Sequence, residues 1–165
     1  MKKSIALILA LVMVLALAAC GKDSGGTATY TDDELVERLF GICEGRTGEM
    51  PVETTSFKRL SDDGFETAGL FANWFNGMEV PEGALVAVNQ PMMGQAHVVL
   101  LIQPGEGTTA DDLLKELTDN ANPAWNICMV ADTVEYAVKD GIILFLMTDS
   151  ELGVDVQGIL DAFNT

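Results

Sequence analysis

The chain has 165 residues and a formal net charge of −16, because 25 acidic residues outnumber 9 lysines and arginines. A chain of this length fits one domain with its own hydrophobic core. Its negative charge disfavours phosphate backbones and anionic lipid headgroups, so we expect no nucleic-acid partner. A cationic protein partner, a divalent cation or simple solubility is compatible with such a surface.

The N-terminal segment has the three parts of a secretory signal peptide. Met1-Lys2-Lys3 gives a positive start, and an uninterrupted apolar stretch of 15 residues follows from Ile5 to Ala19. This stretch is shorter than the roughly 20 residues that span a bilayer as a helix. The small residues Ala18 and Ala19 then offer a cleavage site directly before Cys20.

The order Leu17-Ala18-Ala19-Cys20 resembles the lipobox of bacterial lipoproteins. The resemblance implies that Cys20 is lipidated, with palmitate as a typical acyl chain, and that residues 1–19 are removed as a lipoprotein signal peptide. The lipid would then hold the protein on the extracytoplasmic face of the cell membrane. Two other interpretations are a transmembrane anchor, which would be short, and an ordinary signal peptide in which Cys20 is incidental.

Residues 20–29 predict a flexible tether, because Gly21 to Thr29 includes three glycines and no large apolar side chain. We therefore expect a single domain over residues 30–165. Its first helix is predicted at Thr31-Asp32-Asp33-Glu34, which has the pattern of a capping box. Leu35, Leu39 and Ile42 follow at helical spacing, and the helix should end between residues 41 and 45.

The middle of the chain predicts a loop, a helix and a hairpin. Glycines and a proline interrupt residues 45–62, which favours a loop, with or without a short extended piece at 54–60. A helix beginning near Asp63 would place Phe71 and Trp74 on its apolar face. Two strands are predicted at residues 84–89 and 96–102, and the second is almost entirely apolar.

The last third predicts a helix, a second hairpin and a closing helix. A clean amphipathic helix begins after Thr109, and Asp140-Gly141 is a strong hairpin turn between strands at 133–138 and 142–147. Thr148 and Glu151 form another capping-box pattern before the final helix. Together these elements predict an α+β fold, an antiparallel sheet built from two hairpins with helices on one face, preceded by two helices.

The C-terminal half also resembles a group of small bacterial lipoproteins to which no function is assigned. The resemblance depends on the apolar strand Gln95–Ile102, the acidic helix Ala110–Leu117 and the hairpin-helix unit Tyr136–Phe163. It implies the same α+β fold and surface location, and it brings no catalytic residues.

Two cysteines, Cys43 and Cys128, remain besides Cys20. Export would place them outside the reducing cytosol, where a pair of cysteines can form a disulfide. Closing a loop of about 85 residues would contribute on the order of 4 kcal/mol in the chain-entropy model. The alternative is two separate thiols that pack as small hydrophobic side chains. The sequence leaves both possibilities open.

His97 is the only histidine, and it alternates with Val99 and Leu101 along a predicted strand. A triad or a zinc site would need more partners, and the sequence has neither zinc-ligand spacing nor a nucleophile elbow. Met92 and Met93 with His97 make only a weak Cu(I) donor set. We therefore expect a half-buried strand histidine, no catalytic residue, no cofactor and no metal site.

These observations predict a membrane-anchored extracytoplasmic lipoprotein that acts as a non-enzymatic binding or interaction module. Its expected partners are the membrane, through the lipid on Cys20, and a cationic protein or another envelope component. An exposed Trp74 or Trp125 would be the first candidate for an anchor of such a partner. The alternative is a small surface hydrolase that uses paired carboxylates, although acidic pairs such as Asp32-Asp33 and Asp111-Asp112 fall at predicted helix starts.

Overall fold

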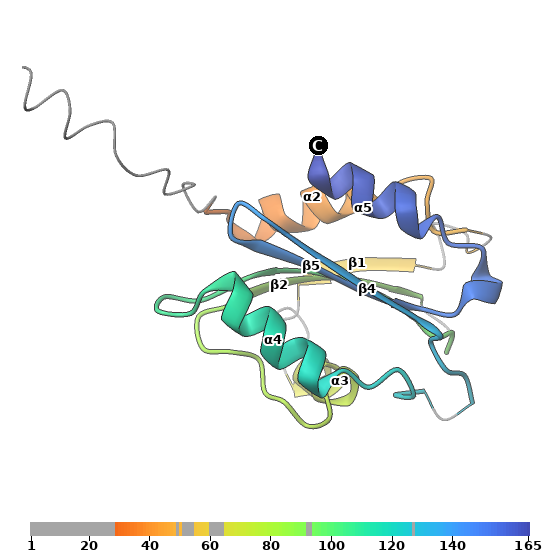
Figure 1. Cartoon of the computed structure of the whole chain (residues 1–165), viewed down its shortest axis with the longest axis horizontal. Coiled ribbons are helices and arrows are strands. Elements are labelled where there is room, and N and C mark those ends of the chain that lie inside the picture. The colour runs from red at the N-terminus through yellow and green to blue at the C-terminus, as the bar shows by residue number, and fades with distance from the viewer. Residues whose placement is uncertain (1–28, 49, 51–54, 60–64, 92–93, 127) are drawn as a thin grey trace, which may run out of the picture.

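The computed structural model describes residues 29–48, 50, 55–59, 65–91, 94–126 and 128–165 (Figure 1). The elements in chain order are α2 (Asp32–Cys43), β1 (Thr55–Arg59), α3 (Phe65–Trp74), β2 (Leu85–Pro91), β3 (His97–Gln103), α4 (Ala110–Asn120), β4 (Thr133–Lys139), β5 (Ile142–Thr148), the 3₁₀ turn η2 (Ser150–Leu152) and α5 (Val156–Asn164).

The strands form one antiparallel sheet in the order β1-β2-β3-β5-β4. Two hairpins, β2–β3 and β4–β5, make up most of it, as the sequence predicts, and they pair through β3 and β5. The short extended piece that the sequence left open near residues 54–60 is the edge strand β1. The α+β fold and its antiparallel sheet are therefore confirmed.

Helices cover both faces of the sheet, whereas the sequence predicted helices on one face. In Figure 1, α2 and α5 lie on one side and α3 and α4 on the other. Successive side chains of β3 alternate between the two sides: Val98 and Leu100 face α3 and α4, and Val99 and Leu101 face α2 and α5. Because β3 and β5 are apolar on both faces, each face needs its own layer of helices.

The first helix begins as the sequence predicts. The Thr31 hydroxyl accepts a hydrogen bond from the backbone N–H of Glu34, and the Glu34 carboxylate accepts one from the backbone N–H of Thr31. The hydrogen bonds that the Thr31 N–H and the Thr31 hydroxyl donate to the Glu34 carboxylate lower its pKa. Leu35, Leu39 and Ile42 are buried against the sheet, which fixes the inward face of α2.

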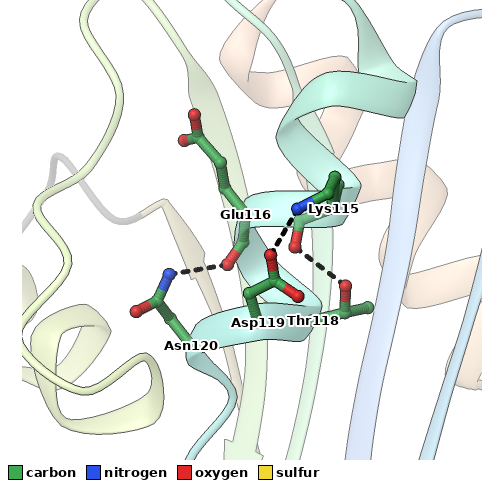
Figure 2. A network of polar contacts seen from close by, with 5 residues as sticks. All are labelled: Lys115, Glu116, Thr118, Asp119 and Asn120. Atoms are coloured by element: carbon green, nitrogen blue, oxygen red, sulfur yellow. Dashed lines mark hydrogen bonds and ion pairs between the residues drawn. The ribbon is translucent and has the colours of Figure 1, made fainter.

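The face of α4 that points to solvent carries a short polar network (Figure 2). Lys115 Nζ and a carboxylate oxygen of Asp119 are 2.6 Å apart, and Asn120 donates to the Glu116 carbonyl at 2.9 Å. Both members of the ion pair are exposed, so the pair contributes little to stability. The helix is held mainly by Leu113 and Leu117, which are fully buried.

The closing helix begins later than the sequence predicted. Thr148 is the last residue of β5, and Asp149 caps the 3₁₀ turn η2 by accepting from the Glu151 N–H. Gly153 then adopts a left-handed conformation, with φ of 67°, and the Asp155 carboxylate caps α5. The pattern Thr148–Glu151 was therefore wrongly interpreted as the start of α5, because Asp149 caps a separate 3₁₀ turn there and Gly153 ends that turn before α5 begins.

Candidate functional site

Three buried polar side chains lie together within the sheet. Asn89 on β2, His97 on β3 and Thr148 on β5 are each at most 1% exposed. His97 and Thr148 are directly paired in the register of β3 and β5. Nδ1 of His97 lies 3.0 Å from the Thr148 hydroxyl, and Nε2 lies 3.3 Å from the Asn89 side-chain oxygen. Each ring nitrogen therefore has a polar neighbour.

Burial lowers the pKa of His97 to about 4, so the imidazole is neutral at pH 7. Its two polar neighbours, Asn89 and Thr148, do not titrate in this range. The histidine is more deeply buried than the half-buried residue that the sequence predicted. The arrangement is that of a polar group satisfied inside the sheet, because neither neighbour is a carboxylate that would orient a catalytic imidazole.

Both remaining cysteines are free thiols, so a Cys43–Cys128 disulfide is not formed. Cys43 is buried in the cluster between the sheet and α2, where burial raises its pKa to about 12. Cys128 is exposed and lines a depression that also includes Leu70, a residue packed on the opposite side of the sheet. Cys43 fits the alternative of a buried hydrophobic side chain, and Cys128 does not.

The two tryptophans occupy different environments. Trp74 is only 1% exposed and belongs to the core below the sheet, so it is not available to a partner. Trp125 is partly buried, and it packs against the same core while also lining an open depression of about 580 Å³. Of the two tryptophans that the sequence suggested as anchors for a partner, only Trp125 is accessible.

The depression around Trp125 forms where three segments meet. Its lining comes from α3, from the two ends of the β2–β3 connection and from the segment after Pro123; the residues are Leu70, Asn73, Gln90, Pro91, Gly94, Gln95, His97, Trp125, Asn126 and Cys128. Asn126 Nδ2 donates to the Gly94 carbonyl at 2.7 Å, and Asn122 Nδ2 donates to the Asn73 carbonyl at 2.9 Å. These hydrogen bonds position the Trp125 segment against its neighbours.

The lining combines polar and apolar side chains, and none of its described residues is charged. Four side chains are carboxamides, and no lysine, arginine, aspartate or glutamate is among the described residues that line the depression. Because each carboxamide both donates and accepts hydrogen bonds, the surface complements peptide groups. Among the residues that the structure describes, the side chains of Asn73 and Gln95 make no hydrogen bond, so their donors and acceptors face solvent or a ligand.

A second open depression of about 630 Å³ lies at the other end of β3. The segment from Gln103 to Asp111 forms much of its wall, with Thr29, Gly83, Val138 and Gly141. Glu106 and Asp111 both line it and both are exposed. Neither carboxylate therefore lies in the buried, apolar kind of pocket that surrounds the general acid of a carboxylate-pair hydrolase.

The acidic pairs that the structure describes lie at helix starts. Asp32 and Asp33 lie in the first turn of α2, and Asp111 and Asp112 lie in the first turn of α4, where Thr109 accepts from the Asp112 N–H. Asp62 and Asp63 lie outside the described residues. Within the described ranges, no group of three or more His, Cys, Asp or Glu side chains is arranged to hold a metal ion.

Cys20, the residue on which the lipobox interpretation depends, lies outside the described residues, as do Met92 and Met93. In the part of the chain that the structure covers, no helix has the length and apolar character needed to cross a membrane. No protein-family model, curated protein or solved structure matches the chain.

The sequence did not reveal the carboxamides around Trp125. Asn73, Gln90, Gln95 and Asn126 come from separate segments, and Asn and Gln are too common on surfaces to stand out. One usable signal was Trp125 itself, a large aromatic residue in the polar segment Asn122-Pro123-Ala124-Trp125-Asn126. An aromatic side chain outside a regular element is a candidate for an interface.

Proposed function

We propose that the protein is a membrane-anchored extracytoplasmic lipoprotein that acts as a binding module without catalytic activity. The lipid on Cys20 would hold it at the membrane after removal of residues 1–19, and residues 20–29 would connect the lipid to the domain. Support for the anchor comes from the lipobox pattern at Leu17-Ala18-Ala19-Cys20.

The observation that carries the binding role is the uncharged depression around Trp125. A tryptophan that is partly exposed at a concave surface offers a large apolar contact area to a partner. Asn73 and Gln95 provide hydrogen-bond donors and acceptors at the same place. This combination of one aromatic residue with several neutral polar groups suits a segment of a partner protein.

The proposed partner is a cationic protein of the cell envelope. The formal net charge is −16 for the whole chain and −18 once Lys2 and Lys3 are removed with residues 1–19. This charge would attract such a partner over the Debye length and raise its association rate. The depression itself has no charge among its described residues, so it would contribute apolar contact and hydrogen bonds rather than ion pairs. Long-range steering and short-range contact would thus depend on different residues.

The experiment is a pull-down from envelope extracts with the full chain, tagged at its C-terminus and extracted in mild detergent. Trp125→Ala should reduce capture of the partner, because the aromatic contact is lost. Gln95→Ala should reduce it by less, and Gln157→Ala on the exposed face of α5 should not change it. Gln157 is the matched control, since its side chain donates only to Asp161 on its own helix.

Asn73→Lys and Asn73→Asp separate binding from folding. Asn73 is exposed at the end of α3, so both variants should fold like the wild type. Lysine would repel a cationic partner and reduce capture, whereas aspartate would not. Equal capture by Trp125→Ala, Asn73→Lys and the wild type would refute the proposed site.

No specific observation favours the hydrolase alternative. Glu106 and Asp111 share a depression, but both carboxylates are exposed to solvent. Turnover of an envelope polymer that is lost on mutation of these two residues would nevertheless replace the binding proposal.

A further inference from the structure

The outer edge of β4 is open to pairing. β4 is the last strand in the sheet order, and no described strand pairs with its outer side. All seven of its residues pair with β5 on the inner side, from Thr133–Thr148 to Lys139–Ile142. An exposed edge of this length presents unpaired N–H and C=O groups to a second strand.

The turn between β4 and β5 determines which groups point outward. Asp140 and Gly141 have φ angles of 52° and 77°, as a two-residue type I′ turn requires. Lys139 and Ile142, which flank this turn, are then a hydrogen-bonded pair, and such pairs alternate along antiparallel strands. The N–H and C=O groups of Val134, Tyr136 and Val138 therefore face the open edge.

The same strand exposes apolar side chains. Tyr136 is 49% exposed and stacks on Phe145 with a centroid distance of 6.0 Å, and Val138 is 36% exposed. Both lie on the side of the sheet that faces α3 and α4, and both remain exposed there. Large exposed apolar residues beside unpaired backbone groups favour docking of another strand.

The charges of β4 distinguish between the possible registers of a pair of β4 strands. Glu135 and Lys139 lie on the opposite side from Tyr136, four residues apart. In an isologous antiparallel pair of two β4 strands, a two-fold axis at Glu135 would oppose two glutamates, which is destabilising. An axis at Ala137 instead places each Glu135 directly opposite Lys139 of the second copy.

The geometry points to a second copy of this chain as the partner of β4, with the two-fold axis at Ala137. This register forms two Glu135–Lys139 pairs on one side of the joined sheet. On the other side it sets each Tyr136 against Val138 of the second copy, so that both exposed side chains are covered. Tyr136 and Val138 of the second copy are also hydrogen-bonded pairs in this register, so their outward-facing N–H and C=O groups become paired.

The charged residues are free to make these contacts. Glu135 is exposed and forms no ion pair among the residues that the structure describes. Lys139 Nζ donates to the Asn164 carbonyl at 2.8 Å, which leaves two of its three protons for a carboxylate. Lys139 can therefore pair with Glu135 of a second copy and keep its hydrogen bond to Asn164.

Disulfide cross-linking of the full chain in the membranes of an expressing bacterium tests this register. In a Cys128→Ser background, Ala137→Cys should form a dimer on oxidation, because the two residues would be a directly opposed, non-hydrogen-bonded pair about 4.5 Å apart at Cα. Glu135→Cys alone should not cross-link. The double variant Glu135→Cys with Lys139→Cys should cross-link again. It tests the same register without changing Ala137, in case Ala137→Cys fails to fold.

A charge exchange tests the chemistry. Glu135→Lys in the Ala137→Cys background should abolish the cross-link, because it opposes two lysines, and adding Lys139→Glu should restore it. Equal cross-linking of Glu135→Cys and Ala137→Cys would overturn the register. Failure of both Ala137→Cys and the Glu135–Lys139 cysteine pair to cross-link would overturn the second copy as partner.

Discussion

His97 lies in an environment very different from that of a free histidine side chain. Its ring is 1% exposed, and burial lowers its pKa to about 4 from an ordinary value of 6.5. The folded state therefore binds a proton less readily than the unfolded state does. The free energy of unfolding should fall as the pH falls from 6.5 to about 4, and no further loss from this group is expected below that range.

The expected loss is about 3 kcal/mol, since each pKa unit corresponds to about 1.4 kcal/mol. Urea denaturation of the wild type and of His97→Gln at a series of pH values measures the part of this loss that is due to His97. The carboxylates titrate in both proteins, so their contribution cancels in the difference. Glutamine keeps a polar group between Asn89 and Thr148 and has no proton to gain. Parallel stability curves for the two proteins would show that His97 is not protected from protonation.

Cys20 is the proposed attachment point of the lipid anchor. Cys20→Ala should abolish incorporation of radiolabelled palmitate, because the thiol is the proposed attachment point. The precursor should then stay uncleaved after Ala19 or be released into the medium by another protease. Equal labelling of the variant and the wild type would contradict the lipobox interpretation.

At the level of single elements, the leucines of α4 differ in how deeply they are buried. Leu113 and Leu117 are fully buried, whereas Leu114 is only partly buried at the edge of the same core. Leu117→Ala should lower the free energy of unfolding by about 2–5 kcal/mol, and Leu114→Ala by less. Chemical denaturation measures both, and a larger loss for Leu114→Ala would show that the inward face of α4 is assigned wrongly.

The sequence predicted the local elements better than their arrangement. Capping boxes, helical spacing and the turn at Asp140-Gly141 act between near neighbours, so α2, α4 and the β4–β5 hairpin were predicted. Which face of the sheet each helix covers depends on contacts between distant segments. The apolar character of β3 on both of its faces was the local sign that two helical layers were needed.

The candidate site was predictable only through its aromatic residue. Trp125 drew attention as a potential anchor, but Trp74 did so equally, and only the three-dimensional packing separates a buried tryptophan from an accessible one. The carboxamides come together because hydrogen bonds of Asn122 and Asn126 hold their segment against α3 and the β2–β3 connection. Such contacts between segments leave no periodic pattern in the sequence.

At the scale of the whole molecule, charge and contact have separate roles in the proposed function. The processed chain would carry a formal charge of −18, because Lys2 and Lys3 are removed with the signal peptide while all 25 acidic residues remain. Salt screens such a field, and so it affects mainly the association rate of a cationic partner. The uncharged contact at Trp125 would instead control dissociation.

The most direct test is the dissociation constant of the captured envelope partner, measured with the full chain from about 50 to about 500 mM salt. Affinity should fall with added salt without vanishing, because steering is lost and the Trp125 contact remains. Trp125→Ala should weaken binding at every salt concentration, mainly through faster dissociation. An affinity that is indifferent both to salt and to Trp125→Ala would contradict the account.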